Sequence, residues 1–498
     1  MSVSFNSIPS NIQVPLFWAE MDNSAANTTS DGAAPALIIG YANSDASIQR
    51  NALTIMPSAG LAGSLAGRGS QLARMVASYR SIDPFGELWV IALDAPSAGA
   101  AASGALTLTG NAQESGTVYL YIGNVLVQAG VTAGETAADV AATVSAAINA
   151  NVDLPVTAAV ADAVVTLTAR HAGLTGNEIP LALNYYGLVG SQTTPSGINI
   201  DIKAMSGGSG VPDLTGAVAA MGDEPFDFIA FPFNDSSSVS TIHAELADRW
   251  GYARQLYGHV YSAKIGSLSE LVAFGSSLNL EHITVAGYEP DIHTAADELA
   301  ALRTARNAGF IRNDPARPTQ TGELTGALPA PKGSRFIFSE QQSLLTHGIA
   351  TAYVESSSLR IQRDITMYKK NAFGVTDNSF LDSETLHTSA YVLRQLKSVI
   401  TSKYPRHKLA SDGTRFGAGQ AIVTPAVIRG EMLAVYRKME RAGIVENYDL
   451  FKKYLIVERN ADNPNRLDVL FPPDYVNQLR IFALVNQFRL QYSAEEAA

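Results

Sequence analysis

The sequence predicts a multidomain protein of mixed α/β and α+β class, centred on a Rossmann-like α/β middle domain. Three observations lead to this prediction. A chain of 498 residues is too long for one hydrophobic core, so two to four domains are expected. Apolar strand-like runs alternate with helical stretches in two separate parts of the chain. Between and after these parts the composition changes, which indicates an inserted domain and a distinct C-terminal region.

The middle domain is predicted to comprise residues 31–94 and 211–332. Apolar runs such as ALIIGY and HITVAGY are typical of buried strands, and strands that alternate with helices favour a mostly parallel sheet covered on both faces. The expected strands are 36–41, 87–93, 226–233, 259–264 and 282–288. The expected helices are 69–79, 214–221, 240–256, 267–277 and 294–307.

Residues 95–210 interrupt this pattern. The block is rich in Ala, Gly, Thr and Val, and its only basic residues are Arg170 and Lys203. Linker-like Gly- and Ser-containing segments flank it, so we expect a mostly β domain inserted into a surface loop. Its one expected helix is 136–149, with Thr136 as the N-cap. The expected strands are 105–109, 117–122, 125–129, 164–170 and 181–185.

Residues 333–473 are predicted to form an α+β domain. Residues 335–339 and 350–361 are strand-like. A long helix capped by Ser383 follows, and Thr424-Pro425 begins another, since proline is favoured in the first helical turn.

Residues 1–30 are predicted to form an extended arm. Prolines within this segment cannot donate ladder hydrogen bonds, so the segment belongs at the edge of a sheet or outside one. A frayed N-terminus is the alternative, although free termini rarely expose large apolar side chains. The side chains expected to mediate pairing are Ile12, Val14, Leu16 and Trp18.

Residues 474–498 contain a second apolar, strand-like segment. One phase of its alternation ends near Asn486-Gln487 and the other begins there, which indicates a bulge or bend. The segment is either the closing strand of the chain's own sheet or an arm that adds a strand to another subunit. The residues expected to carry this pairing are Leu479, Ile481, Phe482, Ala483, Leu484, Val485, Phe488 and Leu490.

The charge is unevenly distributed. The net charge is −11, but the first 345 residues hold 15 basic and 30 acidic residues, whereas the rest hold 20 and 16. An acidic body joined to a mildly basic region suggests two different surroundings. Because the basic residues are interspersed with acidic ones, no nucleic-acid surface is predicted.

A small basic cluster lies near the end of the long helix. It consists of Lys397, Lys403, Arg406, His407 and Lys408. Two interpretations remain open: the charges complement the helix dipole, or they dock onto an acidic partner.

Several functional classes are disfavoured by composition. The chain has no cysteine, so disulfides and cysteine chemistry are excluded. No apolar run approaches the length of a membrane span, so no membrane insertion is expected. The first basic residue is Arg50, so we expect no signal peptide and folding in a cytoplasm.

A search for chemical motifs predicts no catalytic, cofactor-binding or metal-binding residues. The glycine-rich segment Gly60–Ser70 lacks the lysine and spacing of a phosphate loop, so a flexible strand-to-helix turn is expected. His282 and His293 are expected to have surface and capping roles. The acidic group Asp377, Asp382 and Glu384 is expected at a turn and a helix N-terminus, where carboxylates are favoured electrostatically.

Several segments resemble one protein family. These are SFNSIPSNIQVPLFWAEMDNS at 4–24 and LLTHGIATAYVESSSLRIQRDITMYKKNAFGVTDNSFLDSETLHT at 344–388. GTVYLYIGNVLVQAGVTAGETAADVAATVSAAINA and TLTARHAGLTGNEIPL, from the inserted block, are further matches. With these segments the chain resembles the tail sheath protein of Mu-like contractile-tailed bacteriophages over essentially its whole length.

The resemblance implies a structural role without a cofactor. Sheath subunits assemble with themselves around a tail tube, between the baseplate and the tail terminator proteins. An α+β inner domain built from both chain ends would face the tube, with Lys397, Lys403, Arg406 and Lys408 as a possible tube-facing cluster. The inserted β-rich block would be an outer domain, and the terminal arms would pair with neighbouring subunits.

The implied location is the virion tail, assembled in the host bacterial cytoplasm. Contraction would drive the tube through the host cell envelope during genome delivery. Two alternatives remain: the sheath of a phage-like bacteriocin or secretion device, and an α/β nucleotide-binding enzyme that uses Gly60–Ser70.

Overall fold

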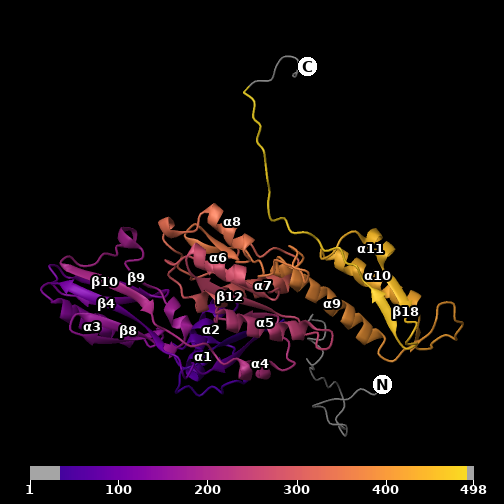
Figure 1. The fold of residues 1–498 in the computed structure, drawn as a ribbon, viewed down its shortest axis with the longest axis horizontal. Coiled ribbons are helices and arrows are strands. Elements are labelled where there is room, and N and C mark those ends of the chain that lie inside the picture. Colours follow the sequence, from indigo (N-terminus) through magenta and orange to yellow (C-terminus); the bar gives the residue numbers. More distant parts are fainter. Residues whose placement is uncertain (1–33, 491–498) are drawn as a thin grey trace, which may run out of the picture.

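The computed structural model describes residues 34–490. Figure 1 shows an elongated arrangement, with the inserted domain at one end, the middle domain in the centre and the C-terminal helices at the other end. The mixed α/β multidomain class predicted from the sequence is confirmed. The arm expected at residues 1–30, with Ile12, Val14, Leu16 and Trp18, lies outside the described residues.

The middle domain is organised around a six-stranded sheet in the order β13-β12-β11-β1-β3-β2. All neighbouring pairs are parallel except β2 with β3, which is antiparallel. The strands are β1 (Ala36–Tyr41), β2 (Leu53–Ile55), β3 (Leu88–Leu93), β11 (Phe228–Ala230), β12 (His259–Ile265) and β13 (Ile283–Tyr288).

Helices cover both faces of this sheet because successive strand residues point to opposite sides. In β1, Ala36 and Ile38 pack with α1, α2 and α7, whereas Leu37 and Ile39 pack with α4, α5 and α6. The helices are α1 (Ala59–Ala66), α2 (Gln71–Ile82), α4 (Thr215–Met221), α5 (Ser236–Trp250), α6 (Leu268–Ser277) and α7 (Ala296–Asn313).

The expectation of a flexible turn over Gly60–Ser70 is wrong. Most of this segment is α1, which begins after the cap residue Ser58, whose hydroxyl accepts from the backbone N–H of Leu61 at 3.2 Å. Glycine weakens a helix by only about 1 kcal/mol per residue, and burial of Ala62 and Ala66 offsets that loss.

The inserted domain has its own core between two small sheets and a helix. One sheet has the order β10-β4-β8-β7 and the other β6-β5-β9. Its elements are β4 (Ala101–Gly110), β5 (Gly116–Ile122), β6 (Val125–Val131), α3 (Ala137–Ala150), β7 (Val156–Ala161), β8 (Val164–Ala172), η1 (Leu174–Glu178), β9 (Leu181–Leu183), η2 (Gly187–Gly190) and β10 (Ile198–Ser206). Paired backbone bonds between Ala100 and Ser209, at 3.0 and 3.1 Å, tie its two ends together.

The inserted domain fills the crevice at the carboxyl ends of the middle strands. In open α/β sheets this crevice, where the strand order reverses, is the usual ligand site. Here Leu174 and Thr175 of the inserted domain lie beside Tyr41, the last residue of β1, and Phe233, which follows β11. The domain is therefore docked on the middle domain rather than merely tethered to it.

A buried carboxylate strengthens this docking. Glu178, at the end of η1, accepts hydrogen bonds from Nδ2 of Asn234 at 2.8 and 2.9 Å. Burial raises the pKa of Glu178 to about 7, against the opposing effect of the nearby Lys264 charge. The Tyr185 hydroxyl also donates to the backbone oxygen of Pro329 at 3.1 Å.

The segment after residue 333 packs on the middle domain rather than starting a separate one. Residues 335–339, expected as a strand, instead lead into helix α8 (Phe338–Thr346). A hairpin of β14 (Thr351–Glu355) and β15 (Ser358–Arg363) follows, and Ala350 exchanges backbone bonds with β13 at 2.9 Å. Leu359 and Ile361 share a core with α7, so the packing extends the middle domain past the expected boundary at 333.

Helix α9 (Ser383–Lys403) leads from the middle domain to a final group of helices and hairpins. Its first half lies against β12, and its second half belongs to another core. Thr424 caps α10 with Pro425 in the first turn, as the sequence predicts. The remaining elements are β16 (Lys408–Leu409), β17 (Ile422–Val423), α10 (Pro425–Arg441), α11 (Tyr448–Tyr454), β18 (Ile456–Arg459) and β19 (Leu467–Leu470).

The junction between α9 and the sheet contains a buried histidine that makes folding sensitive to acid. The His387 ring stacks on Phe228 with centroids 5.0 Å apart, and its Nε2 lies 3.0 Å from the Tyr261 hydroxyl. Burial lowers the pKa of His387 to about 3, and the Arg394 charge acts in the same direction. The folded chain therefore keeps this ring neutral at pH values where the unfolded chain protonates it.

We expect His387→Gln to reduce the loss of stability on acidification. Between the unfolded pKa near 6.5 and the folded pKa, unfolding takes up a proton, so the free energy of unfolding falls as the pH falls. From about pH 7 to about pH 5 the variant should lose roughly 2 kcal/mol less than the unaltered chain in urea titrations. His407→Gln, at an exposed histidine, is the control. Equal losses in all three chains would contradict this assignment.

Candidate functional site

The C-terminal segment begins as part of its own subunit. The backbone N–H of Glu446 donates to the oxygen of Asp474 at 2.9 Å, and the N–H of Val476 donates to the oxygen of Ile444 at 3.2 Å. The Gln478 amide donates to the backbone oxygen of Ala316 at 3.0 Å. Residues 474–480 thus form a root for the segment that follows.

Beyond this root the chain leaves the body as an extended segment (Figure 1). Residues 476–490 form no strand in any sheet of the described chain, so the segment is not the closing strand of its own sheet. Its large apolar side chains are between 72% and 96% exposed. They are Leu479, Ile481, Phe482, Leu484, Val485, Phe488 and Leu490, and Ala483 is exposed as well. We call residues 481–490 the C-terminal arm.

The hairpin of β18 and β19 is a sheet of only two strands. Its register pairs Ile456 with Leu470 and Arg459 with Leu467. Within residues 34–490 neither outer edge of this hairpin pairs with a third strand. Two-stranded sheets are marginally stable in water, and the exposed apolar residues Ile456, Val469 and Leu470 add to the unpaired surface.

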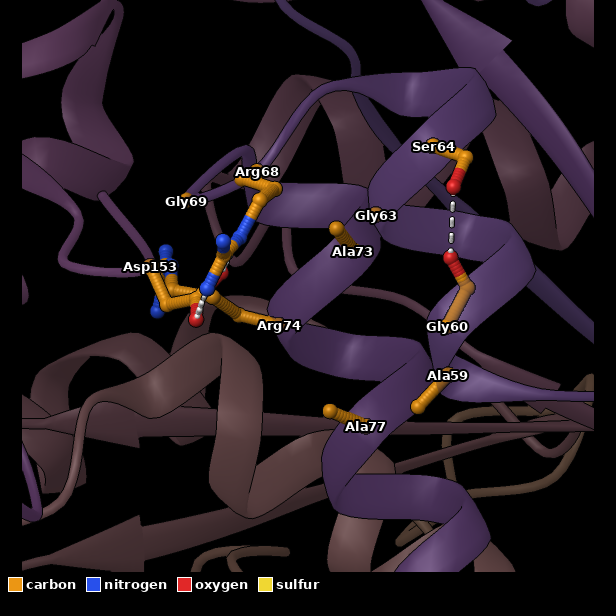
Figure 2. A pocket seen from close by; sticks show the side chains of 10 residues that line it. All are labelled: Ala59, Gly60, Gly63, Ser64, Arg68, Gly69, Ala73, Arg74, Ala77 and Asp153. Atoms are coloured by element: carbon orange, nitrogen blue, oxygen red, sulfur yellow. Dashed lines mark hydrogen bonds and ion pairs between the residues drawn. The ribbon is translucent and has the colours of Figure 1, made fainter. Parts of the chain in front are cut away.

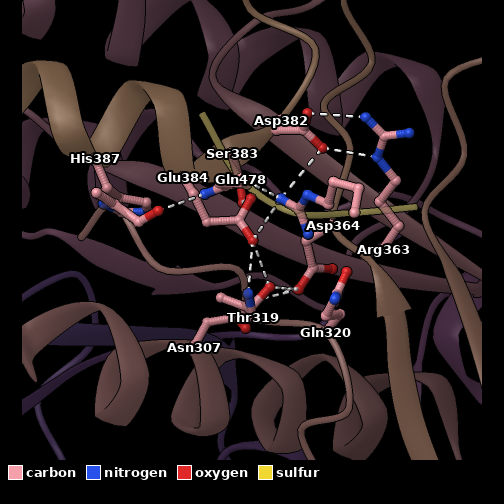
Figure 3. Close-up of polar contacts among 12 residues, drawn as sticks. Asn307, Thr319, Gln320, Arg363, Asp364, Asp382, Ser383, Glu384, His387 and Gln478 are labelled. Carbon is pink, nitrogen blue, oxygen red and sulfur yellow. Dashed lines mark hydrogen bonds and ion pairs between the residues drawn. The ribbon is translucent and has the colours of Figure 1, made fainter. Parts of the chain in front are cut away.

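Three carboxylates expected near the start of α9 have different surroundings, and Figure 3 shows two of them, Asp382 and Glu384. Asp377 lies in a turn and accepts from the Tyr368 hydroxyl at 2.7 Å. Asp382 binds the Arg363 guanidinium through two bonds of 2.8 and 2.9 Å. Glu384 is fully buried, which its position in a first helical turn did not predict. The three carboxylates do not share one site: Asp377 accepts from Tyr368, whereas Asp382 and Glu384 both contact the Arg480 guanidinium.

The basic cluster lies at the far end of α9 and in the loop after it. Lys397, Lys403, Arg406 and Lys408 are all exposed. Lys403 Nζ contacts Glu431 of α10 at 2.8 Å. The other three are exposed to solvent. Figure 1 shows that α9 extends toward the end of the molecule opposite the inserted domain.

A cavity of about 440 Å³ lies between α1, α2 and the inserted domain (Figure 2). It includes the glycine-rich segment that was considered as a phosphate loop. Both of its arginines are engaged: Arg68 Nε contacts Asp153 at 2.8 Å, and Arg74 contacts Asp297 and Glu298 at 2.7 and 2.5 Å. Both arginines that line the cavity are therefore already paired with carboxylates, which disfavours the binding of an anion there.

The two histidines considered as ligands are packing residues. His282 is buried and stacks on the Trp250 ring with centroids 5.0 Å apart, contrary to its expected surface position. His293 contacts the Tyr185 ring of the inserted domain edge-on at 4.9 Å. Over the described range, 34–490, no three His, Asp or Glu side chains come together as a metal site, and no helix is long and apolar enough to cross a membrane.

Comparison with known proteins identifies related sequences. Residues 207–367 match the family model of the phage tail sheath protein central domain, and residues 375–489 match that of the phage tail sheath C-terminal domain. A Mu-like prophage tail sheath protein of Haemophilus influenzae is 39% identical over 98% of this chain and 100% of its own length.

Solved structures of sheath proteins are similar as well. A sheath tail protein of Desulfitobacterium hafniense has a TM-score of 0.48 and 12% identity, covering 94% of this chain and 97% of its own. A sheath tail protein of Listeria innocua has a TM-score of 0.48 and 10% identity, covering 91% and 94%.

Arg74 and Arg68 line the same cavity but differ in burial, which gives a matched pair of substitutions. Arg74 is 10% exposed and its partners Asp297 and Glu298 are 6% and 7% exposed. Arg74→Ala leaves two buried carboxylates unpaired, so we expect it to lower the free energy of unfolding by roughly 3–5 kcal/mol. Arg68→Ala removes an exposed pair and should change stability little. Urea denaturation measures both, and equal losses would contradict the role assigned to burial.

Proposed function

The chain belongs to the phage tail sheath protein family, and from that premise we propose that it polymerises around a tail tube as the subunit of a contractile sheath. Contraction would drive the tube through the host cell envelope during genome delivery. The observation that carries the proposal is the C-terminal arm, whose large apolar side chains are exposed in the part of the subunit that the structure describes. The protein is structural rather than enzymatic, as its family is.

The arm is proposed to add a strand to the β18–β19 hairpin of a neighbouring subunit. Within residues 34–490 the outer edges of the hairpin pair with no third strand, and both the hairpin and the arm expose apolar side chains. Strand addition would pair an outer edge of the hairpin and would also bury apolar side chains of the hairpin and the arm. Each ladder bond contributes about 0.5–1.5 kcal/mol net, and each large apolar side chain buried adds about 1.5–3 kcal/mol before the cost of association.

Such a contact also explains open-ended assembly. The arm and the hairpin are different surfaces, so the contact is head-to-tail and need not close into a small ring. Residues 481–490, fully extended, span about 33 Å, at about 3.3 Å per residue. An arm of that length would keep subunits linked while they rotate and slide. Contraction would then be the release of a metastable arrangement and would need no ATP.

The other partners follow from the sheath role. We propose that the inner surface, including Lys397, Lys403, Arg406 and Lys408, faces the tail tube, and that baseplate and tail terminator proteins bound the sheath. The N-terminal arm with Ile12, Val14, Leu16 and Trp18 would pair with further neighbours. Assembly in the host bacterial cytoplasm would yield a virion component. The Mu-like prophage relative favours a phage tail over a bacteriocin or secretion device.

Purified chain should form hollow, regularly striated tubes in electron microscopy. A chain that ends after Arg480 should keep its melting temperature but form no tubes, because it retains the root and lacks the arm. A full-length control with Ile481, Phe482 and Leu484 changed to Ser should behave like the truncated chain. Tubes formed by the truncated chain would contradict the proposed strand addition.

Leu470→Glu tests the acceptor hairpin. The side chain is 57% exposed, so the isolated subunit should fold with an unchanged melting temperature. A carboxylate there would be buried against the incoming arm, which opposes strand addition. We expect loss of tubes by electron microscopy. Val189→Glu, at a 99% exposed position of the inserted domain, is the matched control and should leave tube formation intact. Tubes from both variants would exclude this hairpin as the acceptor.

A further inference from the structure

Arg480 lies where the arm leaves the body. Its charged side chain is largely buried, whereas the apolar side chains on either side of it are exposed. The Arg480 side chain is 11% exposed, whereas Leu479 and Ile481 on either side of it are 72% and 78% exposed. Charged residues normally stay in water and apolar residues leave it. A buried arginine between two exposed apolar residues therefore indicates a specific partner for the charge.

That partner is a set of carboxylates at the start of α9. Arg480 Nη2 lies 3.0 Å from Oε1 of Glu384 and 3.4 Å from Oδ1 of Asp382. It also contacts the Gln478 side chain. The Gln320 amide donates to the backbone oxygen of Leu479 at 3.4 Å, next to this contact. The root is thus held by an ion pair at its last residue, Arg480, as well as by backbone hydrogen bonds.

Glu384 depends on Arg480 for its counter-charge. The neighbouring carboxylates have other cations, since Arg363 binds Asp382 and Arg303 binds Asp364. Among the described residues, the ion pair to Glu384 comes from Arg480. Burial raises the pKa of Glu384, and the Arg480 charge opposes that rise. A buried carboxylate without a cation is strongly unfavourable, so the contact holds the arginine in place.

The same cluster connects the root to the middle domain (Figure 3). Thr319, which follows α7, donates to Glu384 through its backbone N–H at 2.9 Å and its hydroxyl at 2.7 Å. Its hydroxyl also lies 3.3 Å from Asp364, which accepts from Asn307 of α7 at 2.9 Å. A continuous polar path therefore runs from the root of the arm to α7 and α9.

We propose that Arg480 is a positioning residue that fixes the point and direction at which the C-terminal arm leaves the subunit. The inference rests on the proposed strand addition, because a fixed exit would present the arm to a neighbour in one orientation. Nη2 makes the contacts to the carboxylates, while Nε and Nη1 have no hydrogen-bond partner among residues 34–490. A lysine could therefore replace much of the interaction, whereas alanine could not.

The absence of cysteine allows a direct test by spin labelling. Cysteines placed at Ala483 in the arm and at Ser398, an exposed residue of α9, give one labelled pair per chain. Labelled chain is diluted with unlabelled chain, and pulsed electron paramagnetic resonance gives the distribution of distances within one subunit. We expect Arg480→Ala to at least double the width of this distribution and Arg480→Lys to keep it near that of the parent. Arg415→Ala, at an exposed arginine of the β16–β17 loop, should leave it unchanged.

Glu384→Gln separates positioning from stability. The amide removes the charge that attracts Arg480 but keeps an oxygen for the Thr319 donors, so the body should melt at or above the parent temperature. The distance distribution should still broaden. A width that follows the melting temperature across the variants, or no broadening in either Arg480→Ala or Glu384→Gln, overturns the proposal. The distances are measured within one subunit, so this result stands whether or not the chain forms tubes.

Discussion

A fully buried ion pair between Arg303 and Asp364 joins helix α7 to the segment that leads from the β14–β15 hairpin to α9. Both side chains have 0% exposure, and each would be strongly destabilising alone. Arg303 belongs to α7 of the middle domain, and Asp364 lies between the β14–β15 hairpin and α9. Because Thr319 links Asp364 to Glu384, the position of α9 and the root of the arm both depend on this pair. The root from which the proposed inter-subunit contact extends is therefore connected to a fully buried ion pair.

The middle domain has the architecture of a ligand-binding sheet but uses it for packing. Its parallel strands reverse order between β1 and β11, where a nucleotide would be expected in an enzyme of this architecture. The inserted domain occupies this crevice with Leu174 and Thr175, and Glu178 binds Asn234 beneath them. The architecture therefore serves to orient one domain on another, which agrees with the structural role of the family.

The sequence predicted those elements whose position is set by neighbouring residues, such as an uninterrupted apolar run or a helix cap. Strand β1 has the expected bounds, 36–41, because its apolar run is short and uninterrupted. The helix α3 begins after Thr136 as predicted, with a capping box to Asp139. Helix α1 was missed because its glycines favour a loop and its stability comes from burial against α2. Strand-like residues 335–339 led instead into α8, since tertiary packing overrides propensity in short segments.

The anchoring cluster could not be predicted from sequence because its members are distant in the chain. Glu384 was placed correctly in a first helical turn, but its burial depends on Thr319 and Arg480. Arg480 falls between Leu479 and Ile481, out of phase with the apolar alternation, and gave no signal beyond its charge. The arm residues Ile481 and Phe482 were identified by composition, whereas their exposure required the fold of everything else to be known. A segment that is apolar in sequence and exposed in the subunit can be understood only at the level of the assembly.

The contrast between a fixed root and an exposed arm constrains how a sheath of such subunits could move. The body is held by buried ion pairs and by cores that connect the middle domain to its neighbours. Within residues 34–490 the arm has no strand pairing that would have to break when it is displaced. Subunits could therefore rotate as rigid bodies while their arms remain paired, with φ and ψ changes confined to the segment after Arg480. In that case the free energy released on contraction would come from the contacts between the bodies of neighbouring subunits. The arms would set only how far those bodies can separate.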